Sequence, residues 1–166
     1  MAAPRYLANI SGFITMVVAA VTSAANSIVA TDSTGRIDIS MMPVGIIADT
    51  VIATASEAIS AGALVNFYNN AGTINVRNAD STNASKPAHG FVLASVLSSG
   101  TATVYNLGQQ NTAATGLTVG SVYFLSTVGA LTATPPSTSG NLVQEVGVAI
   151  TTTQLSTYLR STITVA

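Results

Sequence analysis

Several residue types are absent or scarce in this chain, and each shortage excludes a class of structure. The 166 residues include no cysteine, which excludes disulfide bonds and thiolate metal sites. There is no tryptophan, and histidine and lysine occur once each, as His89 and Lys86. Only 7% of the residues are charged, against about a quarter in average globular proteins. The net charge of −1 leaves no basic surface for nucleic acid, which needs several clustered Lys or Arg residues.

The hydrophobic fraction is high for a chain with so few charges. It is 48%, so the composition differs from that of disordered proteins, which combine low hydrophobicity with high charge. Alanine and valine supply most of it, alongside many Thr and Ser residues, a composition that favours strands and turns. A β-rich protein is therefore predicted. Few charges also protect weakly against association, so we expect much of the surface to be covered by other subunits.

The first 31 residues admit two interpretations. Residues 1–25 contain Arg5, an apolar run at 12–21 and small residues after it, as a secretory signal peptide does. Against this, Asn9 and Ser11 interrupt the start of the run. The run is also shorter than the roughly 18 apolar residues of a membrane-spanning helix. We favour an N-terminal arm that packs on a neighbouring subunit, and β-branched residues at 14–18 favour a strand there.

The clearest hairpin signal lies between Gly116 and Pro136. From Val122 to Thr127 the side chains are expected to alternate between two faces of a strand. Gly129 can take the positive φ of a tight turn. Residues 131–134 then run back, and two prolines, which cannot donate to a ladder, end the pairing.

Similar signals predict further strands after Pro43. The remaining predicted strands are Ile46–Ala53, Ala63–Tyr68, Thr73–Arg77, His89–Val96, Ala102–Asn106, Leu142–Thr151 and Ser161–Val165. We expect one helical turn at 56–60, tight turns at 69–72 and 98–100, and polar loops at 80–87 and 109–115.

A weak internal repeat runs through this region. Residues 61–67 align with 119–125, and residues 90–94 align with 147–151. Each copy reads as a glycine, a hairpin, a loop and a second glycine that opens an apolar strand. Chance similarity in a chain rich in Gly, Val and Ala is the alternative. Two such units could pack face to face as a small barrel or sandwich.

These patterns define the expected fold and domains. We predict an all-β protein, a compact antiparallel β-barrel or sandwich built from two similar hairpin-containing halves and preceded by an extended N-terminal arm. Residues 1–45 would form the arm and a turn linker for contacts with other subunits. Residues 46–166 would form the β-rich core domain.

No residue pattern predicts chemistry. His89 has no neighbouring motif that would supply an orienting acid and a nucleophile. Asp32 and Asp38 flank a turn, but calcium needs six or more oxygens, and a turn-forming role for Asp32 is the better interpretation. Glu57, Asp80 and Glu145 are scattered. We therefore expect no enzyme activity, no catalytic residue, no cofactor and no metal site.

Two motifs resemble bacteriophage virion proteins. Residues 28–43, IVATDSTGRIDISMMP, resemble a linker that precedes β-modules in phage fibre and cement proteins. Residues 116–136, GLTVGSVYFLSTVGALTATPP, with KPAHGFVLA at 86–94, resemble a module of capsid cement (head decoration) proteins. This chain is poorer in charge than those relatives, notably in the arm.

The resemblance implies a structural role on the outer capsid surface of a virion assembled in the host cytoplasm. A homotrimer would bind the major capsid protein and stabilise contacts between its subunits, without binding nucleic acid or membrane. The alternative is a trimeric fibre, spike or tail-associated structural or adhesion module. The candidate interface residues are Ile14, Val17, Val18, Ile28, Ile37, Ile39, Met41 and Met42.

Overall fold

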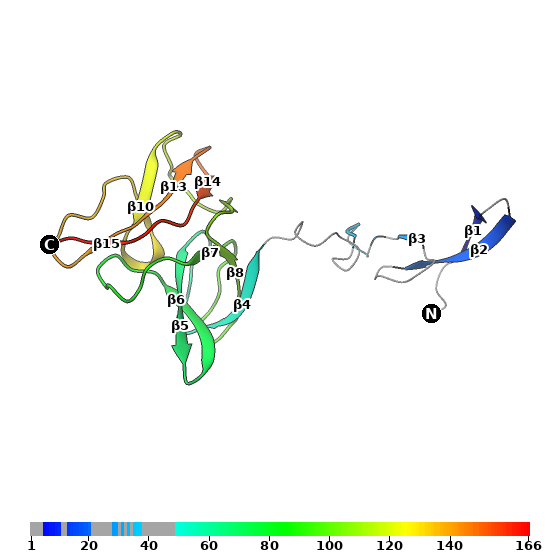
Figure 1. Ribbon diagram of the computed structural model, residues 1–166, viewed down its shortest axis with the longest axis horizontal. Helices are drawn as coiled ribbons and strands as arrows, with labels where there is room; N and C mark the ends of the chain where they lie inside the picture. The colour runs from blue at the N-terminus through cyan, green and yellow to red at the C-terminus, as the bar shows by residue number, and fades with distance from the viewer. Residues whose placement is uncertain are drawn as a thin grey trace. The chain divides into compact units, whose positions relative to one another are not determined.

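The computed structural model describes residues 5–10, 13–20, 28–29, 31, 33, 35–37 and 49–166. The chain divides into two compact units, residues 1–48 and 49–166, which are described separately. Within the described residues every regular element is a β-strand, apart from a single 3-10 turn, η2 (Thr127–Gly129) (Figure 1). The predicted all-β class is confirmed.

The N-terminal unit contains a three-stranded sheet in the order β1-β2-β3. β1 (Arg5–Ile10) pairs antiparallel with β2 (Phe13–Ala20), and β3 (Ile28–Val29) pairs parallel with the end of β2. Strand is thus confirmed at 14–18, where four of the five residues are β-branched.

The turn predicted after β3 is present. Thr31 and Ile37 form an antiparallel bridge across it, and Gly35 has a φ of +80°, the conformation for which glycine was expected. The two acids considered for calcium, Asp32 and Asp38, lie outside the described residues.

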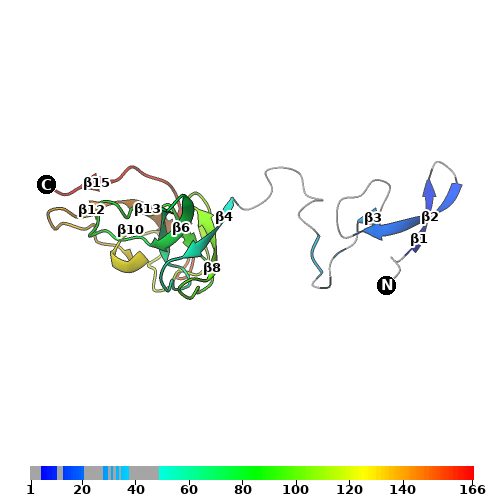
Figure 2. The same cartoon turned by 90° about the horizontal axis from the view of Figure 1, so that it is seen from below.

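The core unit begins with a closed barrel in which the strand order is β4-β6-β5-β7-β8 (cyan and green in Figure 1). A second, five-stranded sheet has the order β11-β10-β13-β14-β9, and β12 pairs with β15 near the C-terminus (Figure 2). The strands are β4 (Thr50–Ala55), β5 (Leu64–Asn70), β6 (Thr73–Asn78), β7 (Gly90–Val92), β8 (Thr101–Asn106), β9 (Gln110–Asn111), β10 (Val122–Leu125), β11 (Leu131–Thr132), β12 (Leu142–Val143), β13 (Glu145–Ala149), β14 (Leu155–Thr157) and β15 (Ile163–Thr164).

The internal repeat is real, and it extends over five strands. The first repeat comprises β4 to β8, and the second comprises β9, β10, β11, β13 and β14. Read from β6, the closed barrel has the order β6-β5-β7-β8-β4, which corresponds strand for strand to β11-β10-β13-β14-β9. The last pair of strands in each order is antiparallel, β8 with β4 in the first repeat and β14 with β9 in the second. The register agrees as well: Val65 pairs with Gly90 in the first repeat, and Tyr123 pairs with Gly147 in the second.

Backbone details of the two repeats match at the start of their first hairpins. Gly62 and Gly120 both have a φ of +79°. The Gly62 N–H donates to the Val92 carbonyl at 2.8 Å, and the Gly120 N–H donates to the Ala149 carbonyl at 2.9 Å. The aligned segments thus agree in register, φ and hydrogen bonding, which supports a true repeat over chance similarity.

The two repeats do not pack with their equivalent faces together. Alternation along β5, β7 and β8 directs Val65, Val92 and Val104 to the inner face of the first repeat, where they form the barrel interior. Leu64, Phe91 and the partly buried Tyr105 lie on its outer face and belong to a different cluster.

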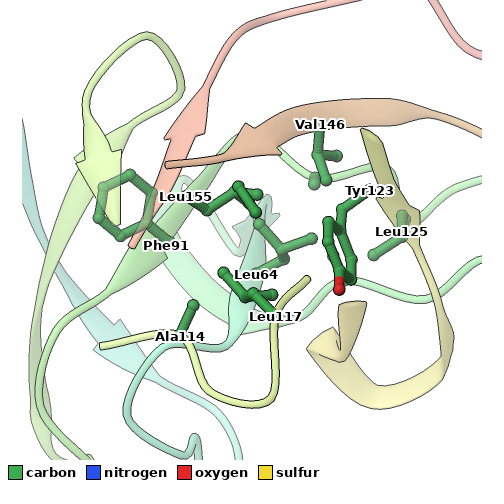
Figure 3. Packing of buried hydrophobic residues seen from close by; sticks show 11 residues of the cluster. Leu64, Phe91, Ala114, Leu117, Tyr123, Leu125, Val146 and Leu155 are labelled. Carbon is green, nitrogen blue, oxygen red and sulfur yellow. The ribbon is translucent and has the colours of Figure 1, made fainter. Parts of the chain in front are cut away.

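That second cluster fills the inner face of the second repeat. Its members Tyr123, Ala149 and Leu155 occupy the positions equivalent to the barrel-lining valines of the first repeat. Figure 3 shows Leu64 between Leu155, Leu117 and Tyr123. The outer face of the first repeat is thus the core of the second, which is a head-to-tail arrangement.

The first repeat also occupies the open seam of the second. The first barrel closes through parallel pairing of β4 with β6, whereas β9 and β11 are the unpaired ends of the second sheet. Residues 60–64 lie at this seam. The Asn111 side-chain amide donates to the Gly62 carbonyl at 2.8 Å, and the Gly129 N–H donates to the Ala79 carbonyl at 2.6 Å.

A buried glutamine ties the two repeats together. The Ala88 N–H donates to Gln144 Oε1 at 2.7 Å, and Gln144 Nε2 donates to the Ala88 carbonyl at 2.8 Å. Gln144 is 1% exposed, and its side chain acts here as a strand partner for one residue of the first repeat. Gln144 also separates β12 from β13, which explains why the single strand predicted at 142–151 is divided.

Other sequence predictions were wrong in detail. Residues 56 and 57 form a bend instead of the start of a helical turn, and Ile59 is held in a bridge to Val96. The predicted loop at 109–115 contains β9, and β14 was missed entirely. Both strands are short, and four of their five residues are polar. Pairing with each other and with β13 stabilises them, together with the burial of Leu155 in the cluster between the repeats.

The two equivalent glycines provide a matched test of the seam. A Cβ at position 62 would overlap the Ala113 carbonyl oxygen, whereas a Cβ at position 120 meets nothing within 4 Å. Both substitutions carry the φ penalty of about 1–2 kcal/mol, so Gly62→Ala should cost clearly more unfolding free energy than Gly120→Ala. Urea denaturation measures both. Equal losses would mean that residues 60–64 do not close the seam.

Gln144→Met should destabilise the core by about 2–4 kcal/mol. The substitution roughly conserves volume but leaves the buried N–H and carbonyl of Ala88 unpaired, at about 1–3 kcal/mol for each group. Thermal unfolding of the variant tests this. Gln154→Met, at a half-buried position for which no side-chain hydrogen bond is seen, is the control, and a loss as small as that of the control would contradict the role given to Gln144.

Candidate functional site

The structure brings part of the predicted interface together in one sheet. Ile14, Val17 and Val18 lie on β2, opposite Asn9, Tyr6 and Arg5 of β1 respectively. Ile28 lies on β3, where it pairs with Ala19 of β2. These four residues therefore belong to one continuous piece of backbone pairing.

The other predicted interface residues separate into two groups. Ile37 closes the turn opposite Thr31 and is 50% exposed, so a large apolar side chain is presented at the linker. Ile39, Met41 and Met42 lie outside the described residues. The prediction that this set contacts a partner stays a prediction.

His89 has a structural role at the entrance to β7. Its Nδ1 accepts the Phe67 N–H at 3.1 Å, and its ring stacks on that of Phe67 with centroids 6.0 Å apart. The Asn66 amide also points at Nδ1, at 3.4 Å, while Arg77 Nε donates to Asn66 Oδ1. Burial lowers the pKa of His89 from its usual value of 6.5. The imidazole is therefore neutral, with Nδ1 already used as an acceptor.

The acids of the core also serve structural purposes. Glu57 accepts the backbone N–H and the side-chain amide of Asn78, and Asp80 accepts hydrogen bonds from Thr82 within its own loop. Glu145 accepts the hydroxyl of Tyr158; burial first, and then this bond, raises the pKa of Tyr158 to about 12. Among the described residues no three His, Cys, Asp or Glu side chains gather as a metal site.

The described part of the chain contains no helix that is both long enough and apolar enough to cross a membrane. What the core does present is a set of exposed apolar side chains, which sequence reasoning did not single out. The residues concerned are Ile52, Ile74, Leu97, Val119, Val122, Val128, Ile150, Leu159 and Ile163. Side chains alternate between the two faces of each strand, and comparing this alternation between the aligned repeats could have identified some of these residues from the sequence.

Comparison with known proteins adds little. No family model matches the chain, and no curated protein matches it. Among solved structures, the N base of head fiber gp8.5 in bacteriophage phi29 is similar over 68% of this chain and 98% of that one. The two sequences are 18% identical and the TM-score is 0.41, a similarity that supports no functional argument.

The His89 geometry predicts that stability depends on pH. Because the folded-state pKa is below 6.5, the folded protein binds fewer protons than the unfolded chain as pH falls past that value. Stability should thus be complete above pH 6.5 and decline below it. Protonation of Nδ1 would set a donor against the Phe67 N–H.

The control is His89→Asn, whose side-chain oxygen can accept the same bond but does not titrate. Thermal midpoints from pH 7.5 to 5 measure both proteins. We expect the wild-type midpoint to fall more steeply than that of the variant, and parallel curves would show that His89 contributes nothing to the slope.

Proposed function

We propose that this protein is a structural component of a bacteriophage virion, a capsid cement protein that binds the outer surface of the head. It acts by association, as a homotrimer that contacts the major capsid protein and stabilises the joints between its subunits. The observation that carries this proposal is the linker motif of residues 28–43 placed directly before a β-core that resembles cement-protein modules.

The positions of the apolar clusters and of the N-terminal strands in the chain support this role. The described residues of both apolar clusters all lie after Asp49, within the core unit. The N-terminal unit has its own strands, and a turn closed by Thr31 and Ile37 follows β3. A core with clusters of its own and a preceding unit with strands of its own suit a protein in which the preceding unit binds a partner.

The surface chemistry fits association. Low charge and scattered exposed apolar side chains protect poorly against contact with other subunits, which suits a protein that binds the surface of a capsid. Burial contributes on the order of 25 cal/mol for each Å² of apolar surface, before the cost of association is subtracted. Repetition over a shell then adds many weak contacts through multivalency.

The direct experiment measures copy number in purified particles. A cement protein should be present in numbers comparable to those of the major capsid protein, and it should rebind to heads from which it has been stripped. A fibre, spike or tail-associated module, the alternative function, should be present in few copies and should not rebind over the shell. Quantitative gel analysis of particles distinguishes the two.

Deleting residues 1–45 should uncouple folding from binding. Since the described residues of both core clusters lie after position 49, the truncated protein should keep a cooperative thermal transition and a β-type circular dichroism spectrum. Its co-sedimentation with undecorated heads should be lost, because the linker and the candidate interface residues are gone. Binding equal to that of the full chain would place the docking surface in the core instead.

A further inference from the structure

The C-terminal segment, residues 159–166, is held to the core mainly through its backbone. It contains β15, which pairs antiparallel with β12 (Figure 2). The Val165 N–H donates to the Asn141 carbonyl at 2.9 Å, and the Gly140 N–H donates to the Val165 carbonyl at 2.9 Å. None of the residues of this segment is buried, and Ile163 is 68% exposed. We call residues 159–166 the strap.

The strap does not pack closely onto the core. Two hollows, of about 380 Å³ and about 480 Å³, are lined by the strap on one side and by the core on the other. Arg160 and Ser161 line both hollows, and Ala88 and Gln144 belong to the core wall of the smaller one. Where the strap begins, Arg160 Cζ lies over the ring of Tyr158, 5.1 Å from its centroid. Apolar burial therefore contributes little to holding the strap in place.

The strand with which the strap pairs is, by contrast, fixed in the core. Leu142 of β12 is 3% exposed, and its N–H donates to the Ser81 carbonyl at 2.6 Å. Gln144, which follows β12 directly, is held by Ala88 through its side chain, and its carbonyl accepts the Leu125 N–H at 2.9 Å. None of these contacts involves the strap. If the strap leaves, β12 is expected to stay in place with the backbone groups of its outer edge unpaired.

We propose that the strap opens while the rest of the core stays folded, and that the β12 edge which it leaves is a docking site for an extended segment of another protein. This inference goes beyond the proposed function and does not depend on it. The kind of occupant follows from β15, which is an antiparallel strand that shares main-chain hydrogen bonds with residues 140–143. A fixed acceptor edge and a weakly packed strand on it are what the exchange of one strand for another requires.

The strap also indicates the chemistry of the partner segment. Residues 161–166, STITVA, have no charged side chain, alternate Thr with Ile and Val, and contain no proline. The acceptor residues 140–143, GNLV, are uncharged as well. We therefore expect an uncharged partner segment that is rich in β-branched residues and free of proline. Because the strap competes from within the same chain, at an effective concentration on the order of millimolar, the partner must present its segment at a similar local concentration.

The test measures the binding of a fluorescently labelled peptide, with the sequence of residues 159–166, to the full chain by fluorescence anisotropy. Val165→Pro removes the N–H that bonds Asn141 and so weakens the strap, while β12 is unchanged. The peptide should bind this variant at least about tenfold more tightly than it binds the wild-type chain. Ala166→Pro, at an exposed position for which no hydrogen bond is seen, is the control and should bind like the wild-type chain. A peptide carrying both Ile163→Pro and Val165→Pro should not bind, because it cannot donate to the edge.

A locked strap should give the opposite result. Val143 and Ile163 are directly opposite each other in the register of β12 and β15. Cysteines at both positions can therefore form a disulfide, in a chain that has no other cysteine. In the double variant Val143→Cys, Ile163→Cys, oxidation should weaken peptide binding by at least about tenfold, and reduction should restore it.

Equal binding of the peptide by the oxidised and reduced double variant would overturn the inference, and so would the absence of any gain from Val165→Pro. The thermal transition of Val165→Pro should stay cooperative and close to that of the wild-type chain. Its loss would show that the strap is a necessary part of the core, which also contradicts the proposal. Oligomers of Val165→Pro that grow with concentration, and that the oxidised double variant does not form, would assign the edge to a second copy of this chain and refute the partner segment.

Discussion

The structure depends on one contact, the burial of Leu64 and Phe91 of the first repeat within the second. These side chains lie on the outside of a closed barrel, where water would otherwise meet them, and they supply the interior that the open second sheet lacks. Removing them from water stabilises both repeats together, at about 1.5–3 kcal/mol for each large side chain. Neither repeat would have the same surface or core without the other.

Tandem copies of one β-unit usually suggest two equivalent lobes, but here equivalent positions have opposite environments. Val65 and Tyr123 occupy one position of the repeat, yet the first lines a barrel and the second joins the core between repeats. Gly62 and Gly120 share a backbone conformation, although only Gly62 is crowded by Ala113. Equivalent positions thus share a backbone conformation, although the space available to a side chain differs between the two repeats.

The sequence predicted the parts of this fold that local chemistry determines. Alternation and turn glycines identified the hairpin around Gly129, whose φ is +72°, and the turn at Ala71 and Gly72. The repeat was visible because two glycine pairs must meet the same backbone requirements. What could not be predicted depends on distant contacts: β9 and β14 are short and mostly polar, and their ladder partners and the burial of Leu155 stabilise them. The buried role of Gln144 depends on Ala88, 56 positions away in the chain. For the proposed interface, the sequence predicted residues on β2 and β3, but it did not single out the exposed apolar side chains of the core, because exposure is a property of the assembled repeats.

The first repeat is a closed barrel and the second an open sheet, and this difference determines which repeat unfolds first. The first repeat has its own ladder all the way round, so it can persist while the second opens. The reverse is unfavourable, since loss of the first repeat removes the side chains that fill the second and the segment at its seam. Backbone amides of β5 and β7 should accordingly belong to the slowest-exchanging class, and those of β9 and β14 to a faster one. The chain thus contains a hierarchy in which the earlier unit acts as a template for the later one, a direction that matches the order in which a ribosome produces them.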